Sequence, residues 1–174
     1  GYNNTSGSYN VFSGFAAGYR NETGSNNVFI GNYSGYYNVS GNRNIMIGYQ
    51  AGVSNTTASY NINIGYYSGR SNETGEYNTF LGYYSGYKAG LSTSSDPGYN
   101  TYIGYETGYN INEGGFNTFL GYRSGYGTNT SPNTSYRNTA IGYESGYKLE
   151  SGSYNVFLGD QAGYSNTSGS SNTF

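Results

Sequence analysis

The stretch "YNTFLGYYSGY", from Tyr77 to Tyr87, decides the fold, because close copies of it run along the whole chain. A binding or catalytic motif normally occurs once, since one site is enough. A phrase that recurs at a nearly fixed spacing is instead the signature of a repeat architecture, in which each copy is one structural unit.

The basic period of the repeat is 17 residues. Each copy opens with Asn at position one, followed by Val or Thr, Phe, Ile or Leu, Gly and Tyr, and it has a small residue, Gly and Tyr at positions eight to ten. We therefore expect residues 1–174 to form a single array of about ten coils. The opening asparagines are Asn10, Asn27, Asn44, Asn61, Asn78, Asn100, Asn117, Asn138, Asn155 and Asn172.

Two repeats are enlarged, and both take their extra residues in the last third of the unit, within 88–99 and 127–137. Each insertion contains one of the two prolines of the chain, Pro97 and Pro132. Insertions accepted at only one place of the repeat predict an exposed corner there.

The phrase predicts strand rather than helix. It has no 3.6-residue periodicity, and Gly and Asn at this density disfavour helix. The short apolar run "TFLG" is typical of a strand, and a second, weaker strand is expected through "SGY". Two short strands and two turns fit one coil of an all-β, parallel β-solenoid, in which equivalent residues of successive coils stack about 4.8 Å apart.

Strand alternation places positions two and four on one face and position three on the other. Because position four is almost uniformly Ile or Leu, we expect positions two and four to point into the coil. The aromatic side chains of position three would then form an interface with other copies of the chain. The alternative exchanges the two faces and puts the aromatic rings inside. The predicted interface residues are Phe12, Phe29, Phe80, Tyr102, Phe119 and Phe157.

The other conserved phases of the repeat have structural interpretations. Glycines at positions five and nine permit a positive φ and a close approach of backbones in a tight coil. The asparagines of position one are expected to form a ladder between coils. The tyrosines of positions six and ten predict stacking ladders, with a sugar-binding or adhesive surface as the functional alternative.

Composition excludes several classes of function. Seven basic and nine acidic residues give a net charge of −2 without clusters, which argues against a nucleic-acid surface. The chain has no Cys and no His, so disulfides, thiolate metal sites and the usual general base are absent. No stretch approaches the ~20 apolar residues of a membrane span. We expect no cofactor, no metal and no catalytic residues.

Two weaker site hypotheses remain. Glu106 and Glu144 share position seven, two coils and roughly 10 Å apart, a separation that is marginal for an inverting glycosidase pair. Because Ala, Tyr, Gln and Arg fill this position in the other coils, a solvated face is the favoured interpretation. Several Asn-x-Ser/Thr sequons lie at position twelve, where turn chemistry is the main interpretation and glycosylation the minor one. The glycosylation candidates are Asn21, Asn38, Asn55, Asn72 and Asn166.

The phrases "NVFIGNYSG" (Asn27 to Gly35) and "NTAIGYESG" (Asn138 to Gly146) resemble the head repeats of YadA-like trimeric autotransporter adhesins. They are also similar to the "NTFIGxxAG" repeats of bacterial and phage tail-fibre-like surface proteins. The resemblance covers essentially the whole chain. It implies a left-handed β-roll that assembles side by side as a trimer, outside the cell, for attachment; the units of those heads are shorter than 17 residues.

The main functional hypothesis is therefore a non-catalytic, extracellular structural or adhesive fibre segment. Its expected partners are copies of itself, with surface glycans or matrix receptors as ligands. The alternative is an amyloid-like filament subunit that polymerises end to end. An ice-binding solenoid and a tail-spike polysaccharide-binding protein are weaker alternatives. Both termini fall inside a repeat, so we expect a portion of a longer array.

Overall fold

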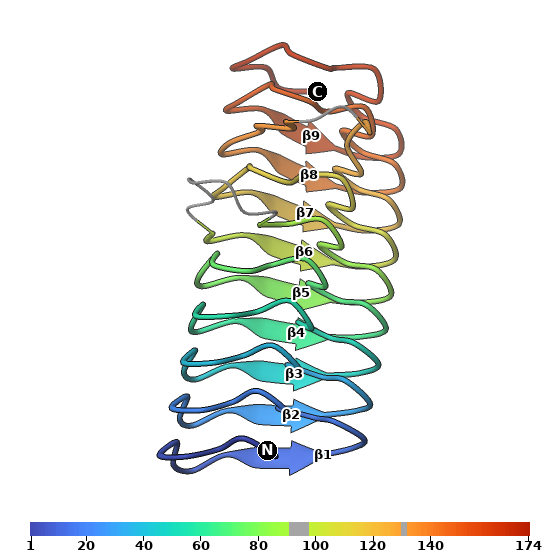
Figure 1. Ribbon diagram of the computed structural model, residues 1–174. Helices are drawn as coiled ribbons and strands as arrows, with labels where there is room; N and C mark the ends of the chain where they lie inside the picture. Colours follow the sequence, from blue (N-terminus) through green and yellow to red (C-terminus); the bar gives the residue numbers. More distant parts are fainter. Residues whose placement is uncertain (91–97, 130–131) are drawn as a thin grey trace.

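Each coil contributes one three-residue strand to a single parallel sheet, as Figure 1 shows for the computed structural model, which describes residues 1–90, 98–129 and 132–174. The strands follow one another in sequence order along the solenoid, and the described residues contain no helix. The strands are β1 (Val11–Ser13), β2 (Val28–Ile30), β3 (Ile45–Ile47), β4 (Ile62–Ile64), β5 (Thr79–Leu81), β6 (Thr101–Ile103), β7 (Thr118–Leu120), β8 (Thr139–Ile141) and β9 (Val156–Leu158).

Equivalent positions of the repeat lie in register. Val28 pairs with Ile45 between β2 and β3, and the same positions align between all neighbouring strands. The enlarged repeats keep this register, since Thr79 pairs with Thr101 and Thr118 with Thr139. The predicted parallel β-solenoid is confirmed. Of the predicted corner insertions, residues 91–97 and 130–131 lie outside the described residues.

The side chains of position three point into the coil. The prediction that they face another chain is therefore wrong, and the exchanged arrangement holds. Among the predicted interface residues, Phe12 is partly buried and the other five are completely buried. The residues predicted to face another chain that instead point into the coil are Phe12, Phe29, Phe80, Tyr102, Phe119 and Phe157.

Ring stacking explains why a narrow coil accepts these aromatic residues. The rings of Phe80 and Tyr102 lie 5.0 Å apart, and those of Tyr102 and Phe119 lie 4.9 Å apart, nearly parallel. A column of flat rings needs little width. The glycine at position nine makes room for it, since a Cβ on Gly86 would lie 2.8 Å from the ring of Phe80.

The glycine at position five is required by both its conformation and its contacts. Gly48 has φ of 133°, which L residues rarely adopt, and an added Cβ would collide with the carbonyl oxygen of Gly65 in the next coil. The predicted use of glycine for turning and close approach is confirmed.

Positions seven and seventeen are left-handed although no glycine occupies them. Every non-glycine residue with positive φ among the described residues lies at one of these two positions, for example Tyr67 (φ 56°) and Tyr77 (φ 57°). Because Gly86 at position nine is also left-handed (φ 60°), the segment "SGY" cannot be extended, and the predicted second strand is wrong. Hydrogen bonds still join the coils there, as from the Gly69 N–H to the Ser85 carbonyl at 2.9 Å.

The predicted asparagine ladder at position one is confirmed. The backbone N–H of Asn27 donates to Oδ1 of Asn10 at 2.9 Å, and Nδ2 of Asn27 donates to the carbonyl of Gly41 at 2.8 Å. From Asn27 to Asn155 these side chains are almost completely buried. The ladder thus ties each strand start to the next coil and satisfies buried backbone groups.

Candidate functional site

The outer face of the sheet is the largest apolar surface that the repeat generates. We define the sheet face as positions two and four of β1 to β9. Isoleucine, leucine, valine and threonine fill it except for Ser13, and it carries no charged residue. Its exposed aliphatic members, at 36% to 65% relative exposure, are Val11, Ile30, Ile45, Ile62, Leu81, Leu120, Val156 and Leu158.

Exposed tyrosines both precede and follow the strands β4, β5 and β6. Tyr77, Tyr99 and Phe116 at position seventeen stack with ring distances of 4.9 and 5.0 Å. Tyr83 and Tyr105 at position six stack at 5.3 Å. The stacking interpretation of the position-six row is confirmed, because rings of successive coils lie nearly parallel. The row at position seventeen adds a tyrosine ladder that sequence reasoning did not assign.

Most predicted glycosylation sites are unavailable in the folded chain. Asn21, Asn38, Asn55 and Asn72 are completely buried, and their Nδ2 groups donate to main-chain carbonyls of the same turn. A completely buried Nδ2 atom leaves no room for a glycan in the folded chain. Only Asn166, in the last coil, is partly exposed.

The two glutamates of position seven are separated by a cation. Arg123 lies at the same position of the intervening coil, and its Nε donates to Oε2 of Glu106 at 2.7 Å in an ion pair. Glu144 accepts a hydrogen bond of 3.3 Å from Nε2 of Gln161 in the following coil. These contacts favour the interpretation of a charged surface row over a glycosidase pair.

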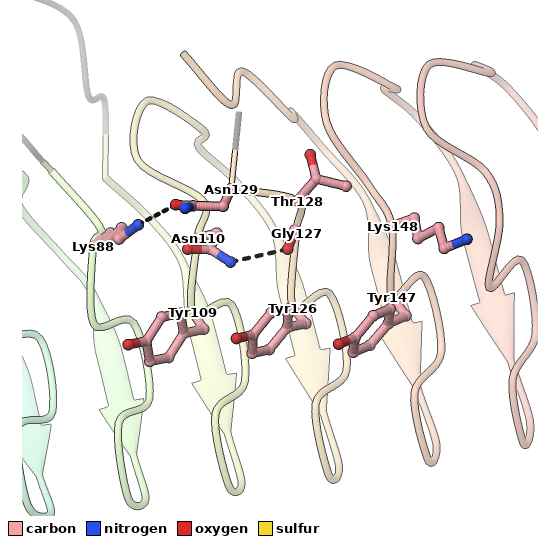
Figure 2. Close-up of a pocket in the computed structure, with 9 residues that line it drawn as sticks. All are labelled: Lys88, Tyr109, Asn110, Tyr126, Gly127, Thr128, Asn129, Tyr147 and Lys148. Atoms are coloured by element: carbon pink, nitrogen blue, oxygen red, sulfur yellow. Dashed lines mark hydrogen bonds between the residues drawn. The ribbon is translucent and has the colours of Figure 1, made fainter. Parts of the chain in front are cut away.

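A groove opens beside the tyrosine row of position ten, over the C-terminal coils (Figure 2). Its volume is about 440 Å³. We call it the tyrosine groove. It is lined by Lys88, Tyr109, Asn110, Tyr126, Gly127, Thr128, Asn129, Tyr147 and Lys148.

The repeat explains why the groove lies here. Position eleven holds Lys88, Asn110, Gly127 and Lys148 in successive coils. Gly127 has no side chain, which leaves space above the tyrosine row between the two lysines. Asn110 bridges this space by donating from Nδ2 to the Gly127 carbonyl at 3.1 Å, and Lys88 donates to Oδ1 of Asn129.

The floor of the groove is a stack of phenols. The rings of Tyr109 and Tyr126 lie 5.2 Å apart, and those of Tyr126 and Tyr147 lie 5.0 Å apart, within 10° of parallel. The ring faces therefore cover one another, and the three hydroxyls point the same way in Figure 2.

Both lysines of the chain, Lys88 and Lys148, lie in this groove. Burial raises the pKa of Tyr109 to about 12, with a smaller contribution from its tyrosine neighbours. Burial is also the main cause that raises the pKa of Tyr126 and of Tyr147. The phenols are neutral hydroxyls at pH 7. The groove combines two cations with neutral hydrogen-bonding groups, and one carboxylate adjoins it, since Oε1 of Glu150 accepts a hydrogen bond of 2.6 Å from the lining residue Thr128.

Sequence reasoning missed this groove. The available signal was the placement of both lysines at position eleven, directly after the tyrosine of position ten. In the described part of the chain no cluster of acidic residues could hold a metal ion, and no helix is long and apolar enough to cross a membrane.

Comparison of the chain with models of protein families, with curated proteins and with solved structures finds no match.

Proposed function

We propose that the chain is a non-catalytic, extracellular structural and adhesive fibre segment that assembles side by side with copies of itself through the sheet face. The observation that carries the proposal is the uncharged row of exposed and half-buried Val, Ile, Leu and Thr side chains along β1 to β9. Contiguous apolar surface of this kind is uncommon on monomers and is typical of an interface.

The size of the surface supports assembly. Nine strands at about 4.8 Å give a length of roughly 40 Å. The strand with its flanking tyrosines spans up to roughly 20 Å, at about 3.3 Å per residue. The resulting area of roughly 800 Å² matches the ~800 Å² that each partner contributes to a stable interface. A flat and regular face suits an identical rod, and the resemblance to trimeric adhesin heads favours three copies.

The test replaces apolar residues of the sheet face by lysine. Ile62→Lys with Leu81→Lys places two charges in the proposed interface, and Thr23→Lys with Thr57→Lys is the matched control at exposed turn positions. Sedimentation equilibrium of the unchanged chain and of the control should give three chain masses. The sheet-face variant should give one mass while its circular dichroism is unchanged.

Two outcomes would contradict the proposal. One is a monomeric unchanged chain at micromolar concentration, and the other is an assembly that survives the sheet-face lysines. Filaments that contain one solenoid in cross-section would support end-to-end polymerisation instead.

A further inference from the structure

The tyrosine groove has the features of a ligand site that the self-assembly proposal does not use. Both lysines line it beside a row of three neutral phenols: Lys88 donates to Asn129, and Lys148 extends towards the next coil, where its Nζ lies 5.5 Å from the ring centre of Tyr164 (Figure 2). Lys88 and Lys148 lie three coils apart, which corresponds to roughly 14 Å along the solenoid axis. The charge pattern therefore fits an elongated ligand with sparse negative charge.

The main chain offers little to such a ligand. The N–H groups of Lys88, Asn110, Gly127 and Lys148 donate to tyrosine carbonyls of the next coil at 2.8 to 3.1 Å. An extended peptide usually binds by adding a strand to free backbone groups at a sheet edge. That mode is blocked here, so recognition depends on the side chains.

The side chains favour a ligand rich in hydroxyls. Tyr109, Tyr126 and Tyr147 supply hydroxyls that both donate and accept hydrogen bonds, and burial raises their pKa values further above neutral pH. Because the rings stack on one another, their faces are covered, and a ligand meets hydroxyls and ring edges. Two cations are too few for a nucleic-acid backbone, whose binding requires many phosphate contacts.

We infer that the tyrosine groove binds an unbranched acidic oligosaccharide that lies along the solenoid axis. Its carboxylate or sulfate groups lie at Lys88 and Lys148, and its hydroxyls lie on the phenol row. The inference rests on the adhesive part of the proposed function, but binding is independent of assembly, because the groove and the sheet face use different positions of the repeat.

Calorimetric titration with defined oligosaccharides tests the inference. The probes are hexagalacturonate and a heparin hexasaccharide, with maltohexaose as the neutral sugar and hexaglutamate as the acidic peptide. We expect at least one acidic sugar to bind, with an affinity that falls as salt rises, and neither control to bind comparably.

Variants locate the site. Lys88→Gln with Lys148→Gln should weaken binding at least tenfold, since both charge-assisted contacts are lost. Tyr126→Phe should weaken binding about fivefold, which is the loss of one net hydrogen bond. Arg20→Gln with Arg43→Gln removes the same charge from the N-terminal coils and should leave the affinity within twofold.

The inference is overturned if neither acidic sugar binds, if maltohexaose or hexaglutamate binds as tightly, or if the double lysine variant binds as the unchanged chain does. The chain mass, measured in the same samples, reports on the sheet face separately. An absence of oligosaccharide binding at the groove can thus be distinguished from an absence of assembly through the sheet face.

Discussion

Position twelve of the coil differs between the two ends of the solenoid. Buried amides occupy it in the N-terminal coils, whereas the apolar residues Ala89, Ile111 and Leu149 occupy it in three of the later coils, and Thr128 and Asn166 in two others. In the first region the asparagines of position twelve form a second amide ladder. Nδ2 of Asn21, Asn38 and Asn55 donates to Oδ1 of the equivalent asparagine one coil earlier, at 3.0, 2.7 and 2.6 Å. In the second region Ile111 and Leu149 occupy the corner and pack with the ring column.

The difference bears on where the repeat accepts insertions. Both enlarged repeats lie in the C-terminal region, and no repeat with a buried asparagine at position twelve is enlarged. An amide ladder is directional, because each member needs the same group one coil away. Apolar packing is non-directional and tolerates a changed chain path beside it.

The two regions meet at a coil with poorly satisfied buried groups. Asn63 occupies position three between Met46 and Phe80, which belong to separate apolar clusters. Neither polar atom of its buried amide has a hydrogen-bond partner, and Oδ1 of Asn55 also has none. The boundary between the two ways of closing the corner is therefore the expected weak point of the rod.

Asn38→Leu should have the largest effect. It removes a middle member of the amide ladder and leaves Oδ1 of Asn21 and one N–H of Asn55 buried without partners. At ~1–3 kcal/mol for each orphaned group, we expect a loss of about 4 kcal/mol in the free energy of unfolding. Urea denaturation measures it, and a loss below ~1 kcal/mol would show that the corner does not depend on its amides.

Leu149→Ala is the corresponding change in the apolar corner. Truncating a completely buried leucine should cost about 3 kcal/mol through lost burial and a residual cavity. The same denaturation experiment provides the value. If Leu149→Asn were tolerated as well as Leu149→Ala, the two corners would be interchangeable, contrary to the comparison.

Asn63→Met should stabilise the boundary between the two regions. Met occupies the equivalent position of the preceding coil, and the change removes a buried amide without partners. We expect a gain of about 2 kcal/mol in the free energy of unfolding. A loss of stability would indicate that the coil is too tight for the larger side chain.

Ala16→Gly tests the backbone strain at position seven, where residue 16 has a left-handed conformation and its side chain makes no ion pair. With φ of 54°, alanine is strained there, so glycine should stabilise the chain by ~1 kcal/mol. Arg123→Gly relieves the same strain but loses the ion pair to Glu106, so its gain should be smaller. Thermal denaturation measures the stability gained by each variant. Equal gains would show that the ion pair between Arg123 and Glu106 contributes no stability.

The smallest effect concerns alkaline pH. The pKa of Tyr109 is raised to about 12 in the folded chain from an ordinary value of 10, so the folded state retains its proton more strongly than the unfolded state. The contribution of the protonated Tyr109 phenol to the free energy of unfolding is complete below pH 10 and is lost as pH rises towards 12. Tyr109→Phe should reduce the fall in melting temperature over this window by about 2 °C, since partial exposure screens the effect. If the melting temperature of the variant fell as much as that of the unchanged chain, groups other than Tyr109 would cause the loss of stability at alkaline pH.

The candidate sites were less predictable than the fold. The solvated interpretation of Glu106 and Glu144 followed from their position, but the ion pair with Arg123 requires the stacked coils to be seen. The tyrosine groove depends on a missing side chain at Gly127 and on the path of the chain beside it. Neither feature is encoded in a local motif, because four successive coils contribute residues to the groove.

The sequence by itself determined the parallel solenoid, the 17-residue coil, the asparagine ladder and the glycine turns, because each of these repeats at a fixed phase and has a local physical cause. Only the tertiary structure decided which face of the strand is buried. Alternation separates position three from positions two and four, but it is unchanged when the faces are exchanged. The width of the coil settles the choice, since stacked rings fit inside it and leave the aliphatic rows on the surface.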